Sequence, residues 1–442
     1  MASDTKMKGG ENFDLKDILN QGKQLGFEQR ISYFSGWMGG LIERGEALYK
    51  REVCSTAGRE VTVYDRYADE KRPMLMFGSN NYLGLTSHPY VQEKVHEAVR
   101  TFGAGVGGPP LLNGYTSLHR EVEERLSAFK KKEETVIFQS GYGSNIGILG
   151  ALASENDTIL YDAFSHASVY DGLRMSRAAA TKFAHNDTAM LEELLQAAAE
   201  GPGDTFVAVE GVYSMDGDVA PLDEMTALCD TYGAILVLDD AHGTGVMGPT
   251  GRGTPQHFGV AEDVDVNMGT FSKAFGVVGA AVSTSKPIAS YLRFFARSYM
   301  FSSSIPPAVL AVVLAGLDVL ENEPELHQRL RDTIDYTVAQ LRPLGFDVHP
   351  TSAVIPLLVP RSMNIRDAAF TFHKMGIFIN SIEYPAVPVD QQRFRISLMA
   401  THTKEDIDRL VACVEEVWAT HAGADDQLPM TPASVTAPEA VA

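Results

Sequence analysis

Val264-Asp-Val-Asn-Met-Gly-Thr-Phe-Ser-Lys273 is the stretch from which the fold of this chain can be worked out. Its apolar residues alternate at Val264, Val266 and Met268, a pattern typical of a buried strand. The strand gives way to small and hydroxylated residues, and the segment ends on Lys273. Such an amine would reach the crevice at the carboxyl end of a sheet, where ligands of open α/β folds bind. There a lysine can lose its proton and attack a carbonyl carbon. A solvated lysine in a surface loop is the alternative.

The same pattern, a short apolar strand followed by small polar residues, recurs along the middle of the chain. Strands are predicted at residues 135–138, 158–161, 205–209, 234–238 and 277–283. Strands that alternate with helices predict an α/β fold with a mostly parallel sheet and helices on both faces. Because the carboxyl ends of parallel strands lie at one edge, we expect the polar groups that follow them to converge there.

The length of 442 residues, with 45% hydrophobic content, predicts two or three domains. We expect an N-terminal arm at 1–70 that packs on something else, a large domain at 71–305, a smaller C-terminal α+β domain at 306–421 and a disordered tail at 422–442. Residues 1–12 are also expected to be disordered. The small domain is predicted to hold helices at 307–321 and 323–341, strands at 346–349, 354–359, 377–382 and 394–399, and a last helix capped by Thr403 and Asp406.

Composition excludes several classes of function. A net charge of −20 argues against nucleic-acid binding, which needs basic patches, and against an anionic membrane surface. The longest apolar run, at 306–317, is too short to span a bilayer. Cys54, Cys229 and Cys413 match no metal or redox spacing, so we expect no metal site. The polar N-terminus lacks the apolar run of a signal peptide, and we expect a cytoplasmic protein.

Gly103-Ala-Gly-Val-Gly-Gly108 matches the glycine pattern of dinucleotide-binding loops. That pattern has this function only when a strand precedes it and a helix follows it. Here a helix is predicted before it, and Pro109-Pro110 follow where the next helix would have to begin. We therefore interpret the segment as a flexible loop near a ligand.

The polar groups at the strand ends together describe one cofactor, pyridoxal 5′-phosphate (PLP). A helix that opens directly after a strand offers free backbone N–H groups to a phosphate. An acid at the tip of an apolar strand needs a partner, such as a protonated ring nitrogen. The phosphate would be held by Gly141, Tyr142, Thr270 and Ser272. His166 would contact the ring, Asp239 would be the acid and Lys273 the amine.

Several stretches carry a resemblance to a known family. They are Ser79-Asn-Asn-Tyr-Leu-Gly-Leu85, His166-Ala-Ser168, Glu210-Gly-Val-Tyr-Ser-Met-Asp-Gly-Asp218, Asp239-Asp-Ala-His242 and Gly269-Thr-Phe-Ser-Lys273. Over about residues 70–420 the chain resembles the α-oxoamine synthases, which are fold-type I PLP enzymes that join an amino acid to an acyl thioester with loss of CO₂. Within that family, Met300-Phe-Ser-Ser-Ser-Ile-Pro306 and Arg395-Ile-Ser-Leu-Met-Ala-Thr-His-Thr403 are most similar to the soluble bacterial serine palmitoyltransferases.

The resemblance implies a role for each matching position. Lys273 would bind PLP covalently and later move the α-proton, and Asp239 would pair with the ring nitrogen. His166 would stack on the ring and touch the substrate carboxylate. His242 and Ser214 would donate hydrogen bonds to the ring oxygen. The phosphate would be bound by Gly141, Tyr142, Thr270 and Ser272, and by Ser303 of the partner subunit in a homodimer with shared active sites. Asn80 and Arg395 would bind the substrate carboxylate, because a guanidinium suits two parallel hydrogen bonds.

The reaction that the resemblance implies condenses L-serine with a palmitoyl-CoA type of thioester, carried by CoA or a carrier protein. The product would be a 3-ketosphinganine-like amine, made in the first step of sphingolipid synthesis. Pro109-Pro110 stand where the bacterial enzymes carry Ser-Arg before Asn113-Gly114. Cysteate (for sulfonolipids), alanine, glycine or a shorter acyl thioester therefore stay open as substrates.

Two further interpretations complete the prediction. Arg393 is an extra cation two residues before Arg395, and we interpret it as a surface residue. A protein with the PLP fold that binds or regulates without turnover is the alternative from another class, but no DNA-binding region is appended to this chain.

Overall fold

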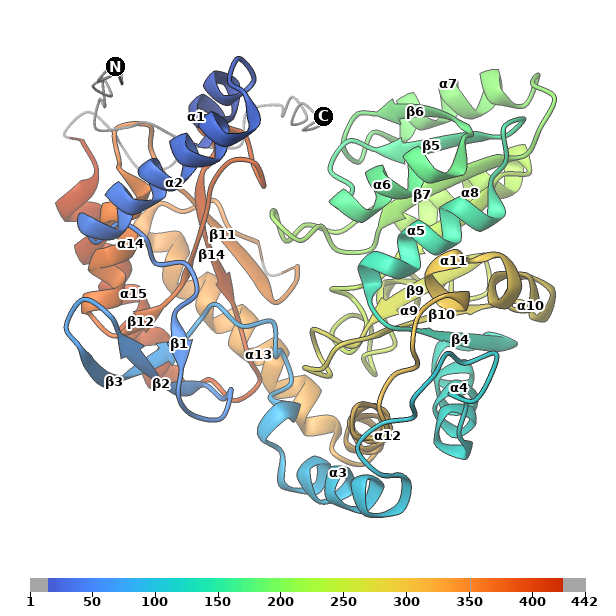
Figure 1. The fold of residues 1–442 in the computed structure, drawn as a ribbon, viewed down its shortest axis with the longest axis horizontal. Helices are drawn as coiled ribbons and strands as arrows, with labels where there is room; N and C mark the ends of the chain where they lie inside the picture. The colour runs from blue at the N-terminus through green and yellow to red at the C-terminus, as the bar shows by residue number, and fades with distance from the viewer. Residues whose placement is uncertain (1–14, 350, 424–442) are drawn as a thin grey trace.

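The computed structural model describes residues 15–349 and 351–423, which form two lobes (Figure 1). One lobe contains a large sheet with its helices, and the other combines segments from both ends of the described chain. Helices α3 (Pro89–Phe102) and α12 (Pro307–Asn322) lie side by side at the base of the two lobes. The disorder predicted for residues 1–12, and for 424–442 of the tail, falls outside the described residues.

The larger lobe is built on a seven-stranded sheet with the order β4-β10-β9-β8-β7-β5-β6. Its strands are β4 (Glu134–Phe138), β5 (Thr158–Asp162), β6 (Ala179–Phe183), β7 (Thr205–Glu210), β8 (Ile235–Asp239), β9 (Val266–Thr270) and β10 (Ala280–Thr284). β10 is antiparallel to both of its neighbours, whereas β9, β8, β7, β5 and β6 run parallel. The predicted α/β fold with a mostly parallel sheet is confirmed.

Helices cover both faces of this sheet, because successive side chains of a strand point to opposite faces. In β7, Phe206 and Ala208 pack in the cluster that includes α5 and α6, whereas Val207 and Val209 pack with α7 and α8. All of β7 is therefore buried, as in other parallel sheets. The helices of this lobe are α4 (Ser117–Lys130), α5 (Gly141–Leu152), α6 (Ala167–Ser176), α7 (Thr188–Ala198), α8 (Leu222–Tyr232), α9 (Thr254–Phe258), α10 (Lys286–Phe295) and α11 (Arg297–Met300).

The smaller lobe contains two sheets. One has the order β1 (Glu52–Val53), β2 (Glu60–Asp65), β3 (Glu70–Met76) and β12 (Ile377–Phe378), and the other β11 (Val354–Leu358), β14 (Arg393–Ser397) and β13 (Asn380–Ile382). Its helices are α1 (Leu15–Gly22), α2 (Phe27–Glu43), α13 (Pro324–Leu341), α14 (Ile365–Lys374) and α15 (Lys404–His421). Short 3₁₀ turns lie at Leu85–Ser87, Arg342–Leu344 and Val389–Gln391.

Two strand predictions for the smaller lobe are wrong. Residues 346–349 form no strand, because Phe346 turns its ring onto Trp418, 5.0 Å away, and the Val348 carbonyl accepts a hydrogen bond from Arg342 Nε at 3.0 Å. Residues 377–382 do not form one strand either. The segment is interrupted at the buried Ile379, and its two halves, β12 and β13, join different sheets.

The N-terminal arm packs on the C-terminal part of the same chain. Trp37 of α2 is buried, and the guanidinium of Arg366 on α14 lies 5.5 Å from the centre of its ring. β3 pairs with β12 in parallel, with Leu75 opposite Ile377. The division into domains stays a proposal, and this pairing favours a first boundary after Met76 instead of at residue 71.

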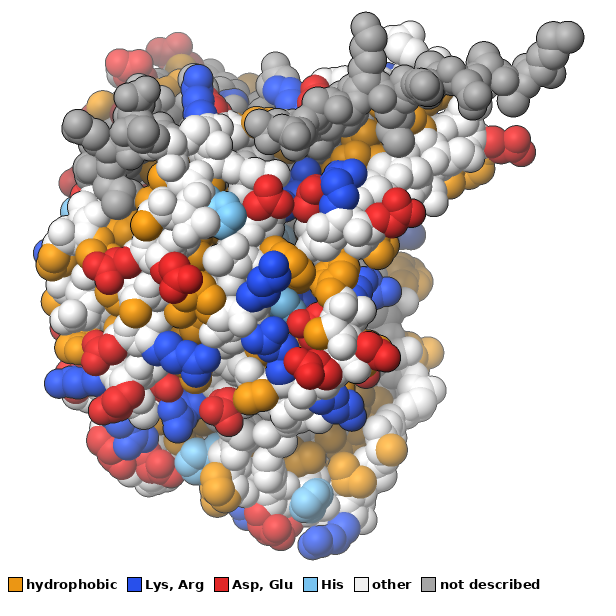
Figure 2. Space-filling view, turned by 90° about the vertical axis from the view of Figure 1, so that its left-hand side faces the viewer, with side chains coloured by type: hydrophobic (Ala, Val, Ile, Leu, Met, Phe, Trp, Pro, Cys, Tyr) orange, Lys and Arg blue, Asp and Glu red, His pale blue; other side chains and the backbone are white. Residues whose placement is uncertain are grey.

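The surface of the smaller lobe carries mixed charge. Figure 2 shows acidic, basic and apolar side chains interspersed over this face. Across residues 15–349 and 351–423, no helix has both the length and the apolar character needed to cross a bilayer. The same residues contain no group of three or more side chains suited to holding a metal ion.

Candidate active site

Four parallel strands of the large sheet end in buried polar residues at the same edge. β5 ends at Asp162, β7 at Glu210, β8 at Asp239 and β9 at Thr270. The loop after β7 reaches from this edge to the smaller lobe (Figure 1), where the Gly217 carbonyl accepts a hydrogen bond from Ser352 Oγ at 2.7 Å. The site therefore lies where ligands of open α/β sheets bind.

Asp239 is buried and is held by two hydrogen bonds. Asn145 Nδ2, from α5, donates to Oδ2 at 2.7 Å, and the backbone N–H of Ala241 donates to Oδ1 at 3.0 Å. Asn145 Nδ2 also donates to Ser168 Oγ at 2.9 Å, and that hydroxyl lies 2.7 Å from His166 Nδ1. A continuous hydrogen-bond network therefore joins the acid at the end of β8 to the histidine that precedes α6.

His166 is the N-cap residue of α6, where its Nδ1 accepts a hydrogen bond from the Ser168 backbone N–H at 3.3 Å. Its side chain is exposed, and the Tyr142 ring lies 6.1 Å away at an interplanar angle of 82°. Desolvation by surrounding protein lowers the pKa of His166, Asp239 opposes this shift and Lys273 adds to it. The site thus presents a flat and mainly neutral ring to a planar ligand.

Lys273 follows β9 in a turn that the Gly276 N–H closes by donating to the Lys273 carbonyl at 2.9 Å. Its ammonium group makes no hydrogen bond or ion pair with the residues that the structure describes. Burial lowers the pKa of this amine, Asp239 and Glu210 oppose the shift, and Arg395 adds to it. An amine that loses its proton more readily than a free lysine is suited to attack a carbonyl carbon.

Arg395 enters the site from β14 of the smaller lobe. It is 6% exposed, and Nη2 donates to Asn80 Oδ1 at 3.0 Å and to the Tyr82 hydroxyl at 3.4 Å. Both of these partners are neutral, and Nε is buried with no hydrogen-bond partner among the described residues. A buried cation without a counter-charge is costly, so this guanidinium fits an anionic ligand such as a carboxylate.

His242 and Tyr82 form a buried pair beside that guanidinium. His242 Nδ1 lies 2.7 Å from the Tyr82 hydroxyl oxygen. Burial lowers the pKa of His242 well below its usual 6.5, and Lys273, Arg395 and His166 lower it further. Burial also raises the pKa of Tyr82 to about 12. Both side chains are therefore neutral at physiological pH.

The start of α5 lies against the end of β9. Ser140 Oγ caps the helix by accepting a hydrogen bond from the Gly143 N–H at 3.0 Å. A Cβ atom on Gly141 would lie only 2.2 Å from Thr270 Cγ2, so this contact requires glycine. A helix N-terminus beside a threonine hydroxyl is a suitable place for a phosphate.

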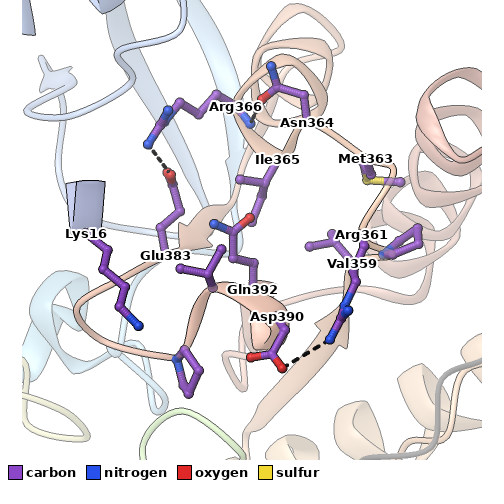
Figure 3. Close-up of a pocket in the computed structure, with 13 residues that line it drawn as sticks. Lys16, Val359, Arg361, Met363, Asn364, Ile365, Arg366, Glu383, Asp390 and Gln392 are labelled. Atoms are coloured by element: carbon purple, nitrogen blue, oxygen red, sulfur yellow. Dashed lines mark hydrogen bonds and ion pairs between the residues drawn. The ribbon is translucent and has the colours of Figure 1, made fainter. Parts of the chain in front are cut away.

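A separate cavity of about 520 Å³ lies in the smaller lobe, between the 359–366 segment and the 383–392 loop (Figure 3). Arg366 in its wall forms an ion pair with Glu383 at 2.7 Å, and Arg361 pairs with Asp390 at 3.3 Å. None of the strand-end residues lines it. We assign no chemistry to this cavity.

Comparisons with known proteins connect this geometry to a family. Residues 72–414 match the family model of aminotransferase class I and II. The chain is 38% identical over 384 residues to serine palmitoyltransferase from Bacteriovorax stolpii, an alignment that covers 85% of this chain and 90% of that protein. It is 40% identical over 349 residues to 8-amino-7-oxononanoate synthase from Geotalea daltonii, with 78% and 89% covered. A solved serine palmitoyltransferase with PLP has a TM-score of 0.82 and 30% identity, and covers 88% of this chain and 98% of its own.

This chain is an α-oxoamine synthase. It belongs to the aminotransferase class I and II family, has the fold-type I architecture and depends on PLP. The family resemblance, the PLP cofactor and the acyltransferase type of activity predicted from the sequence are confirmed.

The site of the synthase fits PLP on its own structural features. Lys273 is an amine of lowered pKa that no described group holds by a hydrogen bond or ion pair, so it is free to bind an aldehyde. The close contact between Gly141 and Thr270 places a helix start beside a threonine hydroxyl, an arrangement that suits a phosphate. Asp239 is fixed on the same strand-end edge, where a carboxyl side chain suits a protonated ring nitrogen.

Most of the predicted site residues of the synthase meet at this edge. Contacts or electrostatic coupling connect Asn80, Gly141, Tyr142, His166, Asp239, His242, Thr270, Lys273 and Arg395 to neighbours within the site. Three other predicted residues are not joined to it. Ser214 is half-buried, Ser272 and Ser303 are exposed, and no described hydrogen bond ties their side chains to the rest.

Four polar residues of the site were missed from the sequence: Tyr82, Asn145, Ser168 and Glu210. Tyr82, Ser168 and Glu210 stand inside the stretches that carry the family resemblance, whereas Asn145 lies outside them. For all four residues the partner of the side chain could not be seen from the sequence. A hydrogen bond such as Asn145 to Asp239 joins two elements 94 residues apart. Only the fold brings them together.

The interpretation of Arg393 as a surface residue is wrong. Its side chain is 3% exposed, and Nη1 forms an ion pair with Asp216 and donates to the Met215 carbonyl at 3.1 Å. The alternating side chains of β14 place both Arg393 and Arg395 on the face toward the larger lobe. Arg393 therefore fixes the loop after β7 to the smaller lobe.

Proposed function

We propose that this α-oxoamine synthase condenses L-serine with a long-chain acyl thioester of the palmitoyl-CoA type to a 3-ketosphinganine-like amine, the first step of sphingolipid synthesis. The structural observation that carries amino-acid binding is the buried Arg395, which donates to Asn80 at 3.0 Å. Its hydrogen-bond partners among the described residues are neutral, and its charge acts on the Lys273 amine. The choice of serine rests on the similarity to serine palmitoyltransferases.

The proposed reaction balances without a further reactant. The bond from the serine α-carbon to its carboxylate breaks and releases CO₂, and a bond from the α-carbon to the acyl carbon forms. The thioester C–S bond breaks, and the thiol leaves with one proton taken from water. The amine and hydroxyl of serine are kept in the product.

PLP, when bound, supplies an electron sink for the charge that develops at the substrate α-carbon. We assign the carboxylate of the substrate to Arg395 and Asn80, because a guanidinium can donate two parallel hydrogen bonds to it. Lys273 would hold the cofactor and then move the proton at the α-carbon, since its lowered pKa suits both tasks. Asp239 would keep the ring nitrogen protonated, and His166 would cover the ring.

The remaining proposed contacts follow the family resemblance. His242 and Ser214 would bind the ring oxygen, and Gly141, Tyr142, Thr270 and Ser272 the phosphate. We also propose a homodimer with shared active sites, in which Ser303 of the partner subunit reaches the phosphate, and an acyl donor carried by CoA or a carrier protein. The cytoplasm is the proposed location, in keeping with three cysteines that are all free thiols.

A second candidate function uses alanine in place of serine. The similarity to 8-amino-7-oxononanoate synthases is as high as that to serine palmitoyltransferases and favours this alternative. Glycine and cysteate, and a shorter acyl thioester, belong to the same set. The condensation chemistry and its site residues would be the same for each of these substrates. Only the side chain of the amino acid and the length of the acyl chain would differ.

A product assay separates these candidates. The PLP-loaded synthase is incubated with serine, alanine, glycine or cysteate, each with short and long acyl-CoA donors, and products are identified by mass spectrometry. We expect the largest kcat/KM for serine with a C16 donor, and no product from Lys273→Ala. A larger kcat/KM for alanine, glycine or cysteate contradicts the serine proposal while leaving the reaction class intact.

A further inference from the structure

The Tyr82 hydroxyl lies at the centre of the site and has three polar neighbours. His242 Nδ1 is the nearest at 2.7 Å, and Arg395 Nη2 and Asn80 Oδ1 each lie 3.4 Å away. The ring is completely buried, in the turn that follows β3, and its partners come from the end of β8 and from β14. The hydroxyl therefore links the two lobes at the point where the proposed carboxylate site meets the cofactor site.

The direction of these hydrogen bonds follows from the chemistry of the partners. A guanidinium can only donate, so the Tyr82 oxygen must accept from Arg395. A tyrosine has one proton to give, and either His242 Nδ1 or Asn80 Oδ1 can accept it. Asn80 Oδ1 already accepts from Arg395 at 3.0 Å. At 2.7 Å against 3.4 Å, the histidine nitrogen is the better acceptor.

We propose that Tyr82 is a positioning residue that fixes the tautomer of His242, so that the imidazole proton sits on Nε2 and is donated to the ring oxygen of PLP. A neutral imidazole that accepts at one nitrogen carries its proton on the other. His242 is neutral, and the charged and titratable groups that act on it are Lys273, Arg395 and His166, all of which disfavour a second proton. Its Nε2 has no hydrogen-bond partner among the described residues, so this donor is available to a ligand.

The inference extends the proposed function, because it assumes that His242 faces the ring oxygen, but it does not depend on which amino acid is the substrate. It also gives Arg395 a second effect. The same guanidinium that would bind the substrate carboxylate keeps the Tyr82 oxygen occupied as an acceptor. The carboxylate site and the ring oxygen are then connected through one hydroxyl.

The test is a pH titration of the visible absorbance of the PLP-loaded protein, without substrate. A donor to the negative ring oxygen weakens its hold on the proton of the neighbouring nitrogen that joins Lys273 to the cofactor. Tyr82→Phe removes the hydroxyl that orients this donor. The midpoint of the absorbance titration, at which this nitrogen loses its proton, should therefore move to higher pH by about one unit. His242→Ala should move it at least as far. Tyr67→Phe is the matched control, because the Tyr67 hydroxyl donates to the Ala47 carbonyl at 2.9 Å, in the smaller lobe away from this site. The titration midpoint of this variant should equal that of the wild type.

The double variant distinguishes positioning from a separate effect. If Tyr82 acts through His242, Tyr82→Phe combined with His242→Ala should titrate like His242→Ala alone. A monofluorinated tyrosine at position 82 is a stronger donor and should move the midpoint to lower pH, which also covers the case in which Tyr82→Phe does not fold. A wild-type midpoint in Tyr82→Phe, additive shifts in the double variant, or no downward shift with the fluorinated residue each overturns the proposal. Failure of the serine assay alone leaves all of these titrations unaffected.

Discussion

Glu210 and Asp239 end neighbouring parallel strands as direct register partners, so two buried carboxyl groups lie side by side on the face of the sheet that α5 covers. Burial raises the pKa of Glu210 well above its usual 4.5, and the charge of Asp239 raises it further. Two adjacent buried carboxyls do not both ionise at low cost. Because its pKa is raised in this way, Glu210 is the carboxyl group that we assign to the neutral form.

This relationship predicts different results for two conservative substitutions. Glu210→Gln replaces a neutral acid by an amide of the same shape and should change the free energy of unfolding by less than about 1 kcal/mol. Asp239→Asn removes the charge proposed to keep the cofactor ring protonated and should lower kcat by roughly 100- to 1000-fold. Urea denaturation and steady-state kinetics on both variants test the assignment. Strong destabilisation by Glu210→Gln with little effect of Asp239→Asn would show that the charges are assigned the wrong way round.

Arg395→Lys should raise the KM for the amino acid by roughly 10- to 100-fold, with a smaller effect on kcat, because an ammonium group cannot replace the two parallel hydrogen bonds of a guanidinium. Arg361→Lys is the control, since Arg361 lies away from the strand-end edge and forms an exposed ion pair with Asp390. Initial rates over a range of amino-acid concentrations measure the effect. An unchanged KM in Arg395→Lys would place the carboxylate elsewhere.

Gly141→Ala should weaken PLP binding, because the added methyl group would lie 2.2 Å from Thr270 Cγ2 and force the start of α5 away from β9. Gly150→Ala is a control on the same helix. Its new Cβ would meet Met175 at an ordinary 3.5 Å, so it should leave PLP affinity unchanged. Fluorescence titration of the PLP-free protein with PLP gives both dissociation constants, and equal values for the two variants count against the proposed phosphate cradle.

His185 predicts a pH dependence of stability. Its ring lies between Asp162, 2.9 Å from Nδ1, and Asp218, 2.7 Å from Nε2, and it stacks on Phe164. Burial lowers the pKa of His185, but the hydrogen bonds and charges of the two aspartates outweigh burial and raise it to about 10. The folded state thus binds this proton more tightly than the unfolded state does. The resulting stability is complete below 6.5 and is lost as pH rises through about 10.

The matching measurement is the urea midpoint of the wild type and of His185→Gln between pH 6.5 and about 10. The two midpoints should lie furthest apart at the low end and converge at the high end. His349→Gln serves as the control, because His349 is a mostly exposed side chain near Asp347, and it should follow the wild type throughout. A gap between wild type and His185→Gln that does not change with pH would mean that His185 is neutral in the folded protein.

The core strands of the fold were predictable because burial on both faces leaves a strong apolar signal. β7 and β9 are buried along their whole length, and both were found within one or two residues of their ends. β6, Ala179–Phe183, was missed because it is an edge strand with one buried residue, Phe183. The break at Ile379 could not be predicted either. A buried apolar residue gives the same sequence pattern inside one strand as in a connection between two sheets.

The candidate site was predictable where a residue type is unusual for its local position, as with Asp239 at the tip of an apolar strand and Lys273 after a strand. Residues whose role depends on a distant partner were not. Tyr82 reads as an ordinary core aromatic, and only the fold shows that its hydroxyl meets His242 across 160 residues of sequence. Ser303 needs a second chain to reach a site, so its role stays a proposal.

The central claim, that Lys273 is the residue to which PLP is bound, is tested most directly by reducing the PLP-loaded protein with borohydride and mapping the modified peptide by mass spectrometry. The reduction fixes PLP to whichever amine holds it. We predict a single labelled peptide that contains Lys273, with no label on the exposed Lys286. A label on another lysine, or a protein that takes up no PLP at all, would contradict this account.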